Sequence, residues 1–323
     1  MNQDPDQKPF AKMPKKVGAY SILAMQTASC RSAIYLAENA AGEKVWLVAL
    51  PNKIDHEYVL NFKRRLETLA QLKHDALPEI QDNRTRKNSH AFATIDYQPL
   101  TSLQERFEME RSDSTPMPAL EALAIIREIA SVLTVLHPAG LVHNNLDPQR
   151  IFYTENQSLL ILDAAFPFIP VPEPDFEGMQ IIRLPYASPE ERAGKPIAAR
   201  GNIYSLGVIL YQLLAGHQPQ LPTSEWDIFE YKALPRELPL KQVRAGLTPE
   251  TYDLVRNCLW QKEWSRYDTM EQLIAAIDIA SKVEEMGPEP VQGFFDLYKK
   301  WIMIAVPVVI ILVLVIIFLL LRS

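Results

Sequence analysis

Cysteine is scarce in this chain of 323 residues, which contains only Cys30 and Cys258. Two cysteines so far apart provide neither a disulfide framework nor the paired spacing of a zinc site. Basic residues are not in excess either, since the formal net charge is -6 at pH 7. Binding to nucleic-acid phosphates needs a basic surface, so the composition predicts no nucleic-acid partner.

Glycine is also sparse, with 11 glycines against 25 prolines. Phosphate-binding loops usually contain glycine, because a residue without a side chain lets backbone amide groups approach a phosphate closely. Residues 1–15 are polar and show no apolar periodicity, which predicts a disordered tail. They lack the long apolar run of a signal peptide, so we expect the folded part to stay on the side of synthesis.

Residues 16–97 predict a small antiparallel sheet with one helix. Apolar and β-branched residues indicate strands at 20–23, 33–37 and 45–50. Leucine and phenylalanine recur at helical spacing over 58–72, which predicts an amphipathic helix after the third strand. Two further strands are expected near 77–80 and at 91–97, so this part would contain five strands.

Residues 98–282 predict a mainly helical part. Apolar residues at core-facing spacing indicate a long helix over 120–136, and the nearly all-round apolar residues at 203–214 indicate a buried central helix. Thr248 before Pro249 has the pattern of a helix N-terminus. Thr269 followed by Gln272 has the pattern of a capping box. The chain is therefore expected to be an α+β protein.

A linker at 283–300 leads into a long uncharged run at 301–321. These 21 residues would form a helix about 31 Å long, and the hydrocarbon core of a bilayer is about 30 Å thick. We therefore expect a single transmembrane helix, with the lipid bilayer as a partner. Lys299 and Lys300 precede the run and Arg322 follows it, so the N-terminal part should face the cytoplasm of a single-pass cell-membrane protein.

Residues 141–152 read LVHNNLDPQRIF, a polar loop between apolar ends, which is typical of a strand-loop-strand active-site platform. This stretch resembles the catalytic loop of the eukaryotic-type protein kinases, which reads H-R-D-L-K-P-x-N-I. The histidine, leucine, proline and isoleucine of that pattern are His143, Leu146, Pro148 and Ile151. Its arginine, aspartate, lysine and asparagine positions hold Asn144, Asn145, Asp147 and Arg150.

A second resemblance covers residues 186–190 (YASPE) and 201–216, which are similar to the A-P-E motif and the S-D-I-Y-S-L-G helix of the same family. The resemblance extends over about 17–281 and implies a bilobal protein kinase-like fold. Its N-lobe, at 16–97, would be a five-stranded antiparallel sheet with one helix, and its C-lobe, at 98–282, would be mainly helical. It further implies that Glu190 pairs with Arg266 and that both, like His143, have structural roles.

The parts that handle nucleotide in the family are altered in the N-lobe. The glycine-rich loop positions are Thr27, Ser29 and Ser32, where side chains obstruct close approach of phosphate. The family's lysine falls on Val48, for which plain packing in a strand is the simpler interpretation, and its helix glutamate falls on Arg65. The resemblance thus implies a degenerate nucleotide loop, and binding of ATP with magnesium is not expected.

The parts that perform chemistry in the family are altered in the C-lobe. Asn145, at the base position, cannot accept a proton at neutral pH, and Asp147 places negative charge at the lysine position. Arg150 stands where asparagine would bind magnesium, and Ala164 replaces a phenylalanine that packs against the N-lobe helix. Asp163 is the only retained metal-ligand position, so no metal and no cofactor are expected.

Arg150 and Asp163 suggest one specific contact. Arg150 is expected to pair with Asp163 as its counter-charge in place of the metal. The alternative is a solvated Arg150.

The hypothesis drawn from these departures is a catalytically inactive pseudokinase, not an enzyme, that acts as a membrane-anchored scaffold or regulatory module for protein partners. Two alternatives stay open. One is a nucleotide sensor that binds ATP without turnover. The other is an atypical protein kinase-like transferase that uses other residues, such as Asp147 or Asp163. The identity of the protein partners does not follow from the sequence.

Overall fold

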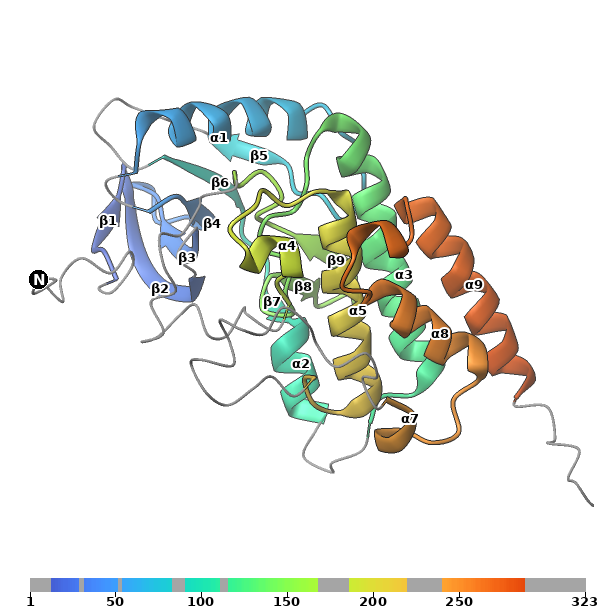
Figure 1. The fold of residues 1–323 in the computed structure, drawn as a ribbon. Helices are drawn as coiled ribbons and strands as arrows, with labels where there is room; N and C mark the ends of the chain where they lie inside the picture. Colours follow the sequence, from blue (N-terminus) through green and yellow to red (C-terminus); the bar gives the residue numbers. More distant parts are fainter. Residues whose placement is uncertain are drawn as a thin grey trace, which may run out of the picture. The chain divides into compact units, whose positions relative to one another are not determined.

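The computed structural model describes residues 13–28, 32–51, 54–82, 91–110, 116–167, 186–219 and 240–287 (Figure 1). Residues up to Glu285 belong to one compact unit. Within that unit a sheet-rich lobe formed by the first part of the chain precedes a mainly helical lobe. The predicted α+β class and two-lobed organisation are confirmed.

The smaller lobe is built on an antiparallel sheet of six strands in the order β1-β2-β3-β4-β6-β5. The strands are β1 (Lys16–Val17), β2 (Tyr20–Ala28), β3 (Ala33–Glu38), β4 (Lys44–Ala49), β5 (Ile80–Asp82) and β6 (Phe92–Asp96). The expected number of five is wrong, because β1 contributes only two residues and is too short to show alternation. A tight turn joins β1 to β2, and Gly18 adopts a φ of 59° there, a left-handed conformation that favours glycine.

One helix, α1 (His56–Leu69), follows the third long strand and lies along the sheet in Figure 1. Its buried face consists of Phe62, Leu66 and Leu69. The helix ends three residues earlier than the predicted 72. The amide groups of Gln71 and Leu72 donate to the carbonyl groups three residues before them, which tightens the chain into a turn.

The larger lobe contains the four helices predicted from the sequence and a further helix at residues 103–110 that was not predicted. They are α2 (Leu103–Glu110), α3 (Ala119–Leu136), α5 (Ala199–Ala215), α8 (Pro249–Cys258) and α9 (Met270–Met286). Shorter turns of helix include α4 (Pro189–Arg192), α7 (Leu240–Val243) and the 3₁₀ turn η4 (Glu263–Ser265). Helix α5 is buried from Gly201 to Ala215 and packs against α3 and α8, which confirms the predicted central helix. An added methyl group at Gly207 would overlap Cys258, so glycine permits close packing of α5 on α8.

Helix caps follow the sequence closely. Thr248 Oγ1 accepts a hydrogen bond from the Thr251 amide at 3.4 Å, and α8 begins at Pro249 as expected. Thr269 Oγ1 accepts from the Gln272 amide at 3.3 Å. The Gln272 side chain accepts from the amide of Asp268 rather than that of Thr269, so the capping box is displaced by one residue.

A second antiparallel sheet, in the order β7-β8-β9, supports the polar loop. Its strands are β7 (Leu100–Ser102), β8 (Ile151–Thr154) and β9 (Leu159–Ile161). The loop therefore exits into a strand, as predicted. The expected entry strand at 141–142 is wrong, because these residues complete the end of α3 and the 3₁₀ turn η3 (His137–Ala139). Gly140 has a φ of 74°, and the Leu141 amide donates to the Leu136 carbonyl at 3.0 Å.

An ion pair joins α4 to the turn that precedes α9. Arg266 Nη1 and Nη2 donate to Glu190 Oε1 and Oε2 at 2.6 and 2.9 Å, and the Arg266 side chain is fully buried. Burial alone would raise the pKa of the Glu190 carboxyl, but hydrogen bonds and charge from Arg266 outweigh it and lower that pKa. The pair expected from the family pattern is therefore present and favours the ionised carboxylate.

We expect this pair to make the fold sensitive to acid. Because the pKa of Glu190 is lower in the folded chain than in the unfolded chain, its contribution is complete above the unfolded pKa and is lost as pH falls through the folded pKa. Glu190→Gln should unfold about 1 to 3 kcal/mol more easily at neutral pH and should lose part of the pH dependence. Urea unfolding at a series of pH values measures both effects, with Glu79→Gln, at an exposed position, as the control. An unchanged pH dependence in Glu190→Gln would contradict the prediction.

No helix in the described part of the chain is long and apolar enough to cross a membrane. The run predicted to do so, at 301–321, lies outside the described residues, as does Ser29.

Candidate active site

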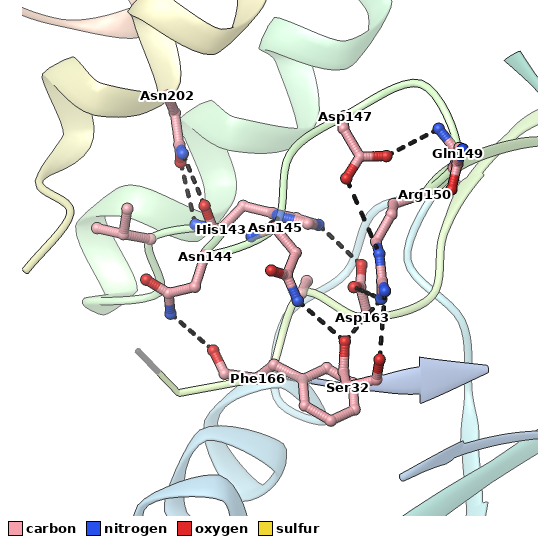
Figure 2. Close-up of polar contacts among 12 residues, drawn as sticks. Ser32, His143, Asn144, Asn145, Asp147, Gln149, Arg150, Asp163, Phe166 and Asn202 are labelled. Atoms are coloured by element: carbon pink, nitrogen blue, oxygen red, sulfur yellow. Dashed lines mark hydrogen bonds and ion pairs between the residues drawn. The ribbon is translucent and has the colours of Figure 1, made fainter. Parts of the chain in front are cut away.

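The polar loop at 143–150 is anchored to the central helix of the larger lobe. Asn202 on α5 donates through Nδ2 to the His143 carbonyl at 2.7 Å and accepts from the His143 amide through Oδ1 at 3.0 Å (Figure 2). An amide side chain can do both, whereas a carboxylate could only accept. Asn202 is fully buried, so this reciprocal pair fixes the backbone at the start of the loop.

Phe166 connects the same loop to helix α1. Its ring stacks on Phe62 with a centroid distance of 4.9 Å, and its carbonyl accepts from Asn144 Nδ2 at 2.7 Å. The loss of a phenylalanine at Ala164 was expected to remove packing against this helix. Within the described residues that packing is provided by Phe166 instead, two residues farther along the chain.

Asp163 lies at the centre of the site, where it contacts two residues of the loop (Figure 2). Arg150 Nη1 donates to Asp163 Oδ2 at 2.7 Å, and His143 Nε2 lies 3.0 Å from Asp163 Oδ1. Both partners of the Arg150 pair are almost completely buried. Burial would raise the pKa of Asp163, but the opposing effects of Arg150 and His143 are stronger and lower it. The pair expected from the sequence is present, and the solvated alternative for Arg150 is wrong.

The hydrogen bonds of His143 define its tautomer. The Asn145 amide donates to His143 Nδ1 at 3.2 Å, so Nδ1 is the unprotonated nitrogen. The proton of the neutral ring is then on Nε2, which faces Asp163. His143 is therefore a buried ring whose Nε2 lies against the carboxylate of Asp163, consistent with a positioning role.

Ser32, immediately before β3, links the smaller lobe to the loop. Its Oγ accepts from Arg150 Nη1 at 2.6 Å and from Asn145 Nδ2 at 2.9 Å, and its carbonyl accepts from Arg150 Nη2 at 3.3 Å. Ser32, Asn145 and Arg150 are all buried. Ser32, at a glycine position of the family pattern, is therefore hydrogen bonded to Asn145 at the base position and to Arg150 at a metal-ligand position.

Helix α1 contributes a second cation. Arg65 donates through Nε to the Ala165 carbonyl at 3.0 Å and through Nη2 to the carbonyls of Val142 and Ala164 at 2.7 and 3.2 Å. Burial lowers the pKa of Arg65 to about 10, so the group remains protonated at neutral pH. Arg65 therefore ties the small-lobe helix to both segments that carry the site.

Of the two remaining N-lobe positions, Val48 packs in the hydrophobic core and Thr27 makes a polar contact with the loop. Val48 is 2% exposed and lies in the main hydrophobic core. Thr27 Oγ1 donates to Gln149 Oε1 at 3.2 Å, a second link between the sheet and the loop. No charge is available at Val48, so any cation that faces a phosphate must come from another position.

Asp147 is the only carboxylate within residues 141–152. Its Oδ1 accepts from the Gln149 amide at 2.9 Å, and its Oδ2 lies 4.0 Å from Arg150 Nε (Figure 2). The longer separation distinguishes Asp147 from Asp163, which makes a direct bond to the same guanidinium group. Burial, and after it the charge of Asp147, raises the pKa of Tyr186.

The residues at Asp163 do not fit the divalent metal that the family pattern implies. Magnesium takes oxygen ligands in octahedral geometry, but both Asp163 oxygens are engaged by Arg150 and His143. Arg150 stands at the second ligand position and has no acceptor atom. In the part of the chain that the structure describes, no three His, Cys, Asp or Glu side chains gather where they could hold a metal ion.

A family model described as a protein kinase domain matches residues 35–276. The chain is 24% identical over 259 residues to the serine/threonine-protein kinase PknB of Mycolicibacterium smegmatis. The aligned region covers 78% of this chain and 40% of that protein. It is 25% identical over 235 residues to PknL of Mycobacterium tuberculosis, also named a serine/threonine-protein kinase, which covers 72% of this chain and 57% of that protein. The matches thus span roughly half of each relative's length.

The structure is similar to the crystal structure of the Mycobacterium tuberculosis PknI kinase domain. The TM-score is 0.62 at 21% sequence identity, and the match covers 82% of this chain and 97% of that one. The two-lobed arrangement described above is therefore a protein kinase fold.

These comparisons contradict the expectation of a catalytically inactive scaffold that is not an enzyme. The matched domain is that of protein kinases, and the relatives are named serine/threonine-protein kinases. The expectation rested on the charges that are missing from their motif positions, while a transferase that uses Asp147 or Asp163 was kept as an alternative. In the structure the carboxylate of Asp147 and the guanidinium groups of Arg150 and Arg65 lie in the same loop or contact it.

Sequence reasoning missed two residues of the site, Asn202 and Phe166. A buried position for Asn202 could have been found from its place in an almost wholly apolar helix, because buried polar groups need partners. Phe166 has no such signal, since its contact with Phe62 joins residues that are far apart in the chain.

Proposed function

The chain belongs to the protein kinase family, and we propose that it transfers a phosphoryl group from a nucleoside triphosphate to a serine or threonine hydroxyl of a protein. The observation that carries this proposal is the family match over residues 35–276, which includes the whole loop at 141–152 and the helix that anchors it. The relatives named as serine/threonine-protein kinases support the choice of acceptor.

The proton acceptor in this proposal is Asp147. The acceptor hydroxyl attacks the terminal phosphorus, its proton passes to the Asp147 carboxylate, the bond to the bridging oxygen breaks, and the nucleoside diphosphate leaves. Asn145 cannot accept a proton at neutral pH. Asp163 is engaged by Arg150 through one oxygen and by His143 through the other. Asp147 is therefore the carboxylate of the loop that is best suited to general-base catalysis.

The rate of transfer should be low. A protein kinase typically turns over about 1 to 100 times per second, and loss of one preorganised electrostatic contact typically costs roughly 100- to 1,000-fold. Val48 supplies no charge to a phosphate. We therefore expect turnover at least about 100-fold below the usual range. Arg150 is the cation within the loop itself.

The test is transfer of phosphate by the purified full chain. The chain is incubated with ATP and a pool of serine- and threonine-containing peptides, and phosphopeptides are identified by mass spectrometry. Phosphate on a peptide or on the chain itself, which depends on both ATP and Asp147, supports the proposal. Absence of phosphate after prolonged incubation contradicts it.

We also propose that residues 301–321 anchor the chain in the cell membrane with the kinase domain in the cytoplasm, where its protein partners would lie. The support is the uncharged run of 21 residues and the preceding lysines Lys299 and Lys300. We expect the full chain to sediment with membranes and to resist extraction by alkaline carbonate, and a chain ending at residue 290 to be released. Release of the full chain by carbonate would exclude a membrane span.

A further inference from the structure

Arg150 occupies a position where a permanent positive charge has no ordinary reason to be buried. Its side chain is 1% exposed, and its guanidinium group contacts Asp163 and Ser32. Burial of a charged group is costly unless the group is paired and hydrogen bonded. Here the single charge of Asp163 balances that of Arg150, so this pair is already neutral.

A divalent cation would disturb this balance. Asp163 provides one negative charge, which Arg150 already neutralises at 2.7 Å. A second cation next to the guanidinium group would be repelled, and it would have to displace either Arg150 or His143 to reach a carboxylate oxygen. The charge of Asp163 is therefore already balanced by Arg150, and a divalent ion is not needed to balance it.

The guanidinium group also has the geometry to bind a phosphate. Arginine presents several N–H donors in one plane, which match the oxygens of a phosphate in pairs. Two of its nitrogens now donate to the hydroxyl and carbonyl oxygens of Ser32, at 2.6 and 3.3 Å. Ser32 is itself one of the three phosphate-loop positions and lies just before β3, so phosphate oxygens could take the place of its oxygens on the same donors.

We infer that Arg150 is the resident cation of this site and that the chain binds its nucleotide without a divalent metal ion. The part that concerns the nucleotide rests on the function proposed above. The part that concerns the cation rests only on Arg150, Asp163 and His143.

The first test uses the metal ion alone and does not depend on the proposed function. The melting temperature of the full chain is measured with EDTA and with millimolar Mn²⁺, for the native chain and for Arg150→Asn. We expect no response of the native chain and an increase of several degrees for Arg150→Asn, because asparagine leaves Asp163 without a cation and offers a ligand oxygen. Arg150→Asn with Asp163→Asn should lose this increase.

The inference would be overturned if Mn²⁺ stabilised the native chain and Asp163→Asn removed that stabilisation. This comparison does not require Arg150→Asn to fold. A folded Arg150→Asn chain that does not respond to Mn²⁺ would also overturn it.

The second test compares ATP binding in EDTA with binding in Mg²⁺. Equal dissociation constants support the inference, and tighter binding in Mg²⁺ by tenfold or more overturns it. Absence of ATP binding in both conditions would contradict the proposed function, while the Mn²⁺ result would still decide the role of Arg150.

Discussion

Replacement of Arg150 by methionine should destabilise the chain by about 3 to 5 kcal/mol, because it leaves the charge of Asp163 buried without a partner. The Arg150 and Asp163 side chains are 1% and 0% exposed, so water cannot compensate for the lost contact. The same change removes the hydrogen bonds to Ser32 that join the two lobes. Urea unfolding followed by circular dichroism measures the effect.

The matched control is Arg127→Met. Arg127 donates to Asp278 at 2.6 Å, but the two side chains are about half exposed. Exposed ion pairs contribute about 0 to 1 kcal/mol, so this variant should remain close to the native chain. Equal free energies of unfolding for Arg150→Met and Arg127→Met would show that the buried pair stabilises the fold no more than the exposed one. The double variant Arg150→Met with Asp163→Leu should recover part of the loss, because it removes both charges together.

Replacement of Asp147 by asparagine should lower the rate of phosphoryl transfer by about 100- to 10,000-fold. Asparagine has nearly the same shape, and its side-chain oxygen can still accept from the Gln149 amide, which donates to Asp147 Oδ1 in the native chain. The fold and the affinity for nucleotide should therefore change little. The effect should be on kcat and not on KM, because the carboxylate is required for proton transfer only.

The comparison variant is Asp75→Asn, at an exposed position before the smaller lobe's β5. It removes the same charge without touching the loop and should retain the native rate. A rate for Asp147→Asn within twofold of native would show that another group accepts the proton. A large rise in KM with unchanged kcat would assign Asp147 to substrate binding instead.

The fold, and the contacts between residues at recognisable motif positions, could be predicted from the sequence. The loop at 141–152, the central helix and the pair of Glu190 with Arg266 are local patterns or lie at family positions, and the structure contains all of them. The pair of Arg150 with Asp163 was also predictable, because a buried arginine beside a retained acid needs a counter-charge. Periodicity and charge complementarity are sufficient for contacts of this kind.

Contacts between the lobes could not be predicted in the same way. Ser32 is 118 residues from Arg150 in the chain, and Arg65 is 100 residues from Ala165, so neither contact follows from local spacing. The functional interpretation failed for a related reason. A residue-by-residue comparison with a motif shows which charges are missing from their positions, and it left a transferase that uses Asp147 open as an alternative, but it could not show that Arg65 reaches the carbonyl groups of Val142 and Ala164.

Phosphoryl transfer by this chain is best measured as single-turnover transfer of labelled terminal phosphate from ATP, with the native chain and Asp147→Asn in excess over nucleotide. We expect slow transfer to a serine or threonine hydroxyl by the native chain, and a rate at least about 100-fold lower for the variant. No transfer by a folded native chain that binds ATP, or equal transfer by both chains, would contradict this expectation.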